Sequence, residues 1–135
     1  MLKQLYCVLL SVFVLNACTM NANNFAIDKH QAVRDLQEYA IASCLFNQES
    51  PFLRDQGDSW ASAIIQRSRG ALEHFTAVAD VVKAEVSKGN MVVVRAENEP
   101  GHEKPLPIAY CVALLDTVSV RDAVNKAAKK IESAY

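Results

Sequence analysis

The stretch Leu36-Gln37-Glu38-Tyr39-Ala40-Ile41-Ala42-Ser43-Cys44-Leu45 decides the fold, because it places a cysteine on the apolar face of a helix. Asp28 can cap this helix, which we expect to run to about Gln48. Its apolar stripe has helical spacing and consists of Val33, Leu36, Ala40 and Cys44, flanked by Tyr39 and Ile41. The spacing therefore predicts that Cys44 points into the core.

A second cysteine lies on a similar apolar pattern near the other end of the chain. This stripe, at positions i, i+3, i+4 and i+7, consists of Ile108, Cys111, Val112 and Leu115. Further stripes with helical spacing are Trp60, Ile64 and Ser68; Ala71, Phe75, Val78 and Val82; and Val120, Val124, Ala127 and Ile131. We interpret three aromatic residues as part of the core rather than as a cofactor pocket: Trp60, Phe75 and Tyr110. These stripes predict an all-α fold, a small bundle of about five helices.

Helix-breaking residues separate these stripes. Glu49-Ser50-Pro51 is expected to end the first helix, and Asp55-Gln56-Gly57-Asp58 to form a loop. The next helix is then expected to start near Ser59. Gly70 indicates a junction between two helices, with one long kinked helix as the alternative.

The segment before the helix of Cys111 is not helical. Gly89-Asn90 is expected to end the preceding helix, and Met91-Val92-Val93-Val94 predicts a short strand without an obvious pairing partner. From Glu97 to Pro107 the chain carries three prolines, one glycine and four charged side chains, which predict a long, exposed, polar loop. Further on, Ser119 and Asp122 resemble a capping box for the last helix.

Residues 1–17 have the pattern of a cleaved signal peptide. Lys3 supplies a positive charge, Leu5 to Leu15 form an apolar run, and Ala17 is the small residue that a signal peptidase requires. As a helix this run would span about 16 Å, roughly half of a hydrocarbon core of about 30 Å, so it is a poor transmembrane anchor. We expect cleavage to remove it.

The stretch Leu15-Asn16-Ala17-Cys18 resembles a bacterial lipoprotein signal, in which the cysteine becomes the acylated N-terminus. Thr19, rather than an Asp, then favours the outer membrane. The alternative is an ordinary secretory signal that leaves Cys18 as a thiol. Both interpretations place residues 28–135, joined to the N-terminus by a tether of residues 18–27, in the periplasm.

Length and charge set further limits. Of the 135 residues, removal of residues 1–17 leaves 118, enough for one domain with its own core. The removed segment carries one basic residue, Lys3, and no acidic one, so 13 basic and 15 acidic side chains remain, with a formal charge of −2. This charge, without a basic run, disfavours nucleic-acid binding.

The expected export of the chain suggests different fates for the four cysteines. Cys7 leaves with the signal and Cys18 takes lipid, so Cys44 and Cys111 remain. An oxidising periplasm favours a disulfide between them, which would restrict the unfolded chain by about 4 kcal/mol on the entropy model. The alternative is two buried thiols that do not meet.

Strong local signatures of catalysis or metal binding are missing from the sequence, such as a phosphate loop, a nucleophile elbow or a Cys-x-x-Cys pair. His30, His74 and His102 lie in separate segments without ligand spacing. A cysteine nucleophile with a histidine base would require a free thiol, and both core cysteines lie on apolar faces that disfavour the thiolate. The sequence therefore predicts a protein that is not an enzyme and holds neither a metal nor a cofactor.

The loop from Glu97 to Pro107 is the best candidate for a recognition element, because helices hold both of its ends. Its prolines limit the entropy that the loop would lose on binding. Its candidate contact residues are Glu97, Glu99, His102, Glu103 and Lys104. The alternative is a solvated connector.

Three segments together resemble a known family: residues 36–45, Trp60 through Lys88, and Tyr110-Cys111-Val112-Ala113-Leu114-Leu115-Asp116 followed by the last amphipathic helix. The family comprises periplasmic immunity proteins that protect bacteria against type VI secretion amidase effectors. The resemblance covers most of residues 28–135. It implies a small helical protein, often dimeric, with a Cys44–Cys111 disulfide. It also implies inhibition of a papain-fold cysteine amidase that cleaves peptidoglycan stem peptides.

The resemblance further implies that a protruding loop and a helix face, often from different subunits, block the cleft of the amidase. We assign these two parts to the loop from Glu97 to Pro107 and to the face around Glu73 and His74. The expected protein is a homodimeric immunity protein that contacts the membrane only through a lipid anchor. The alternative is a structural or accessory envelope lipoprotein that binds a resident partner or peptidoglycan.

Overall fold

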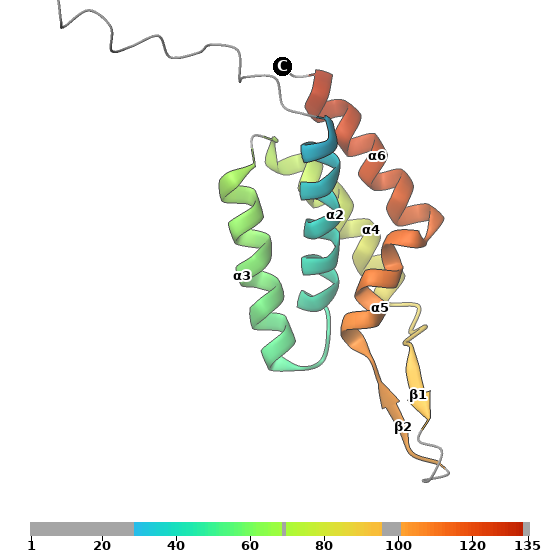
Figure 1. The fold of residues 1–135 in the computed structure, drawn as a ribbon. Helices are drawn as coiled ribbons and strands as arrows, with labels where there is room; N and C mark the ends of the chain where they lie inside the picture. The colour runs from blue at the N-terminus through green and yellow to red at the C-terminus, as the bar shows by residue number, and fades with distance from the viewer. Residues whose placement is uncertain (1–28, 69, 96–100, 134–135) are drawn as a thin grey trace, which may run out of the picture.

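The computed structural model describes residues 29–68, 70–95 and 101–133, and within these ranges it is a helical bundle with one small hairpin (Figure 1). Its elements are α2 (Lys29–Phe46), α3 (Pro51–Arg67), α4 (Leu72–Val86), β1 (Val93–Arg95), β2 (Glu103–Pro105), α5 (Pro107–Ala113), the 3₁₀ turn η2 (Leu114–Asp116) and α6 (Val118–Ser133). Five α-helices in the described residues confirm the predicted all-α bundle. The predicted signal peptide, Cys18, the tether, Glu97 and Glu99 lie outside the described residues.

Helix α2 is the centre of the bundle, because it contacts α3, α4, α5 and α6. Its predicted stripe is confirmed, since Leu36, Ala40 and Cys44 are buried. The largest fully buried side chains come from five helices and meet around α2: Phe75, Leu36, Ile64, Val78, Val82, Val120, Cys44 and Cys111. The rings of Tyr39 and Phe75 meet edge to face, with centroids 5.1 Å apart.

Helix α3 begins earlier than predicted. The sequence indicated a loop at Asp55-Gln56-Gly57-Asp58 and a helix from near Ser59, but the helix starts at Pro51, directly after Ser50. Proline suits the first turn of a helix, because its fixed φ is helical and its missing N–H would be unpaired there. Pro51 therefore starts a helix here, and the polar segment 55–58 forms part of it.

Gly57 explains why a glycine occurs inside α3. A Cβ at this position would lie 2.4 Å from the backbone nitrogen of Phe46 and 2.6 Å from the carbonyl oxygen of Ala42. The backbones of α2 and α3 thus touch at Gly57. At the last residue of α3, Arg67 Nη2 donates to Asp35 Oδ1 at 3.0 Å and pairs with Glu38, so α3 contacts α2 both at Gly57 and at its C-terminal end.

The predicted breaks around α4 are confirmed. Helix α3 ends at Arg67 and α4 starts at Leu72, so Gly70 lies in a junction between two helices. A Cβ on Gly70 would lie 2.8 Å from Ile131 and 2.9 Å from Phe75, which shows how tightly this junction packs on the core. After α4, Gly89 adopts a φ of 72°, a conformation that glycine allows without strain.

The long loop is partly a β-hairpin, which corrects the prediction of a lone strand and an irregular loop. Strand β1 pairs antiparallel with β2, with Val93 opposite Pro105, Val94 opposite Lys104 and Arg95 opposite Glu103. The segment Glu103–Pro105 has little intrinsic strand preference, so only its pairing with the valine run makes it a strand.

Three apolar positions expected in the core lie at the surface instead. Ile108 and Val112 are 60% and 51% exposed, because the buried residues of α5 are Tyr110 and Cys111, followed by Leu114 in η2. Trp60 is 36% exposed at the edge of the α3 face that buries Gly57 and Ile64. Helix α5 is only seven residues long, so it buries a single narrow stripe.

The last helix confirms its predicted core stripe but not its predicted cap. Val120, Val124, Ala127 and Ile131 are buried. Helix α6 begins at Val118, so Ser119 lies in its first turn. The Ser119 hydroxyl donates to Glu85 Oε1 on α4 instead of capping its own helix. The tertiary contact with α4 thus replaces the local capping box.

We predict that Gly57→Ala destabilises the protein by about 1–3 kcal/mol, because the added methyl group pushes α2 and α3 apart. At a helical site with free space, the same change stabilises by roughly 1 kcal/mol. Urea denaturation followed by circular dichroism measures the difference. Ser62→Ala, at an exposed position of α3, is the control and should change stability little. A stabilised Gly57→Ala variant would contradict the close contact.

Candidate interaction site

The β-hairpin projects from one end of the bundle (Figure 1). All three described residues of each strand are exposed, and the hairpin lies beyond α5. Val92, Val93 and Val94 are 40%, 41% and 49% exposed, and Ile108 and Val112 on α5 are also exposed. A two-stranded hairpin is marginally stable on its own. Exposed valines on such an element mark a surface that a partner can cover.

A disulfide fixes the base of the hairpin. Cys44 on α2 and Cys111 on α5 are bonded with an S–S distance of 2.03 Å, and both residues are buried. This confirms the predicted pair, and the alternative of two separate thiols is wrong. Neither sulfur is a free thiol, so neither serves as the cysteine nucleophile considered above. Buried Gln48 donates through Nε2 to the Cys44 carbonyl oxygen at 3.0 Å, and this nitrogen lies 3.5 and 3.6 Å from the two sulfurs.

Glu85 joins three helices at the same end of the bundle. Its backbone carbonyl accepts a hydrogen bond from the Tyr110 hydroxyl of α5 at 3.3 Å, and its carboxylate accepts one from Ser119 of α6. Lys88 pairs with this carboxylate at 2.7 Å. The Lys88 and Ser119 hydrogen bonds lower the pKa of Glu85, whereas burial raises the pKa of Tyr110. The base of the hairpin is therefore held to α2, α4 and α6.

The charges on the described part of the hairpin are not predominantly acidic. Glu103 on β2 accepts a hydrogen bond from Arg95 Nε on β1 at 2.8 Å, and Lys104 adds a second positive charge. This surface ion pair contributes little to stability. His102 lies at the start of β2 and is exposed. Any acidic character of the hairpin therefore depends on Glu97 and Glu99, which lie outside the described residues.

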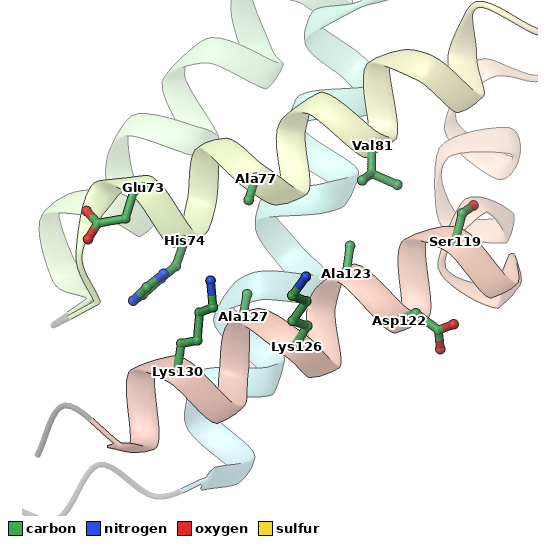
Figure 2. Close-up of a pocket in the computed structure, with 10 residues that line it drawn as sticks. All are labelled: Glu73, His74, Ala77, Val81, Ser119, Asp122, Ala123, Lys126, Ala127 and Lys130. Atoms are coloured by element: carbon green, nitrogen blue, oxygen red, sulfur yellow. The ribbon is translucent and has the colours of Figure 1, made fainter.

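Glu73 and His74, the predicted helix face, line a groove between α4 and α6 (Figure 2). The groove has a volume of about 420 Å³. Small apolar side chains from both helices form its floor: Ala77, Val81, Ala123 and Ala127. Lys126 and Lys130 of α6 extend along it toward α4 (Figure 2). No local sequence pattern indicates that these lysines line a groove, because nothing local shows that α6 packs against α4.

The two predicted contact regions lie at opposite ends of α4. Glu73 and His74 are in its first turn, whereas the hairpin follows its last turn. A helix of 15 residues is about 22 Å long. Within one chain, the structure therefore does not bring the hairpin and the Glu73–His74 face together.

Searches for other kinds of site and for relatives gave negative results. Among residues 29–68, 70–95 and 101–133, no group of three or more His, Cys, Asp or Glu side chains is placed to hold a metal ion. No helix in that part of the chain is long and apolar enough to cross a membrane. Comparison with protein-family models, with curated proteins and with solved structures found no match.

We predict that the double variant Cys44→Ala/Cys111→Ala loses about 2–5 kcal/mol of stability, since the unfolded chain regains the freedom that a crosslink between residues 67 positions apart removes. Urea denaturation measures this loss. Amide hydrogen exchange should increase more in α5 and the hairpin than in α3, because the disulfide ties α5 to α2. An equal increase in every helix would contradict a specific role of the disulfide in holding the hairpin.

Proposed function

We propose that this protein is a periplasmic immunity protein that binds a type VI secretion peptidoglycan amidase and blocks its active-site cleft. The observation that carries the proposal is the hairpin, an exposed element with an apolar strand that projects from a crosslinked bundle. The protein has no catalysis of its own in this proposal. It is exported and lipid-anchored to the outer membrane through Cys18.

Occlusion by a hairpin is supported by how the hairpin is held. An inhibitor gains affinity when its binding element loses little freedom on association. The disulfide and the Glu85 contacts fix the helix that follows β2, and Pro105 and Pro107 restrict the connection between them. The partner would cover the exposed valines of β1, and their removal from water would contribute the apolar part of the binding free energy.

The test of this proposal is protection of cells. The chain, with and without residues 1–17, is expressed in cells that export a type VI cysteine amidase of the same organism, and lysis is followed. Exported protein should prevent lysis, whereas protein without residues 1–17 should not. Failure of both forms to protect would overturn the proposal and favour an accessory envelope lipoprotein.

We predict that Val94→Lys in the hairpin weakens binding to the amidase by about tenfold or more, because it places a charge in the apolar contact. Phe52→Lys is the matched control, since Phe52 is also an exposed apolar residue but lies on α3. Titration calorimetry with the purified amidase measures both affinities, and circular dichroism checks that both variants are folded. Equal affinities of the two variants would exclude the hairpin as the inhibitory element.

The separation of the two contact regions supports a homodimer as part of the proposal. If one amidase cleft contacts a hairpin and a Glu73–His74 face that lie one helix length apart, two subunits can supply one region each. The α4–α6 groove would then face the same amidase as the hairpin of the other subunit.

Mixing two defective variants tests this arrangement. Val94→Lys removes the hairpin contact and Glu73→Lys/His74→Ala removes the helix-face contact, so each variant alone should fail to protect. A mixed dimer carries one intact hairpin and one intact face on different subunits, so co-expression should restore part of the protection. If a tag on one variant co-purifies the other variant but protection is not restored, the two regions do not act across subunits.

A further inference from the structure

A second groove lies on the other side of α4, between α3 and α4, with α2 as its floor. Its volume is about 270 Å³. Tyr39 and Phe46 of α2 contribute aromatic rings, Asp58 of α3 lies on one wall, and Asp80 and Lys83 of α4 lie on the other. None of these residues belongs to the hairpin or to the α4–α6 groove. The groove is therefore a separate surface that the proposed function does not use.

The two carboxylates of this groove are available to a ligand. Asp58 and Asp80 are exposed, and among the described residues neither forms an ion pair, not even with Lys83 in the same groove. The charge of Asp80 acts on the Tyr39 phenol: burial raises the pKa of Tyr39 most, a hydrogen bond with Ser43 lowers it, and Asp80 raises it further. Asp80 thus lies close to an aromatic ring of the floor.

Phe46 supplies the second aromatic surface. It is 46% exposed at the end of α2, although it is one of the largest apolar side chains in the chain. Its backbone lies against α3, because a Cβ on Gly57 would be 2.4 Å from its nitrogen. Its exposed side chain lines the groove, where a flat group can pack on the ring.

We propose that this groove binds an arginine side chain of a partner protein. A guanidinium group packs flat on aromatic rings and donates paired hydrogen bonds to carboxylates, so it matches a groove with the exposed ring of Phe46, the edge of Tyr39 and a carboxylate on each wall. With Lys83 counted, the charged side chains of the groove sum to −1. The lysine weakens the attraction but does not cancel it. This proposal does not rest on the identity of the amidase, since it concerns the chemistry of one side chain.

The experiment uses the folded chain of residues 18–135 and a blocked amino acid as the probe. Nα-acetyl-arginine methylamide is titrated into ¹⁵N-labelled protein, with the citrulline analogue as a neutral probe of the same shape. The arginine probe should shift the amide signals of Tyr39, Phe46, Ala61 and Asp80 with a Kd of about 10 mM, as befits one small group. The citrulline probe should not. Equal shifts with both probes, or no shifts with the arginine probe at several times that concentration, would overturn the proposal.

Three variants separate binding from folding, because their expected effects on the affinity for the arginine probe differ: one lowers it, one raises it and one leaves it unchanged. Asp58→Asn/Asp80→Asn should lower the affinity for the arginine probe by about tenfold, because it removes both negative charges. Lys83→Gln should raise this affinity by about two- to threefold. Asp116→Asn, at an exposed carboxylate of η2, should leave it unchanged. Binding that survives the double variant, or that weakens in Lys83→Gln, would overturn the proposal. The unchanged spectrum of each variant without probe confirms its fold.

Discussion

The disulfide between Cys44 and Cys111 is the constraint on which the functional part of the structure depends. It connects the last turns of the central helix α2 to the short helix α5. Helix α5 has only seven residues and a narrow buried stripe, so its own packing holds it weakly. Because α5 directly follows β2, the crosslink also fixes the helix at which the hairpin ends. The rest of the bundle stabilises α2, and α2 in turn positions the hairpin.

The bundle is organised so that α2 is covered on several sides by different kinds of contact. Helix α3 touches the backbone of α2 at Gly57, and Arg67 at the C-terminal end of α3 pairs with Asp35 of α2. Helices α4 and α6 cover α2 with large apolar side chains such as Phe75 and Val124. The helices that surround α2 leave two grooves between them, one on each side of α4. The packing of helices around α2 therefore creates two grooves that are lined by different residues.

The three surfaces differ in what they can recognise. The hairpin offers exposed valines on a backbone that is held only at its base, which suits insertion into a cleft. The α4–α6 groove has an alanine floor with lysines along it, which suits a helix face. The groove between α3 and α4 combines the aromatic residues Tyr39 and Phe46 with the carboxylates of Asp58 and Asp80, which suits a cationic side chain. The proposed function uses the hairpin and the α4–α6 groove, whereas the groove beside Phe46 is the proposed arginine site.

The sequence by itself determined the features that depend on neighbours within a few turns. Helical spacing of apolar residues was sufficient to predict α2, α4 and α6. Glycines were sufficient to predict the breaks on either side of α4, because helix breaking is a local backbone preference. The expectation that Cys7 leaves with a signal peptide and Cys18 is acylated left Cys44 and Cys111 as the predicted disulfide pair. For the candidate site, the sequence placed contact residues on the segment that became the hairpin. It did not predict that Glu103–Pro105 forms a strand.

Only the tertiary structure decided the features that depend on distant partners. Gly57 lies in a helix because the α2 backbone needs a neighbour without a side chain, and Ser119 leaves its capping role because Glu85 is in reach. Both grooves join residues from helices far apart in the sequence, so no local pattern could indicate them. Ile108 and Val112 were predicted to be buried, but the crosslinked α5 turns them outward. Periodicity indicates that a helix has an apolar face, whereas packing decides which residues that face buries.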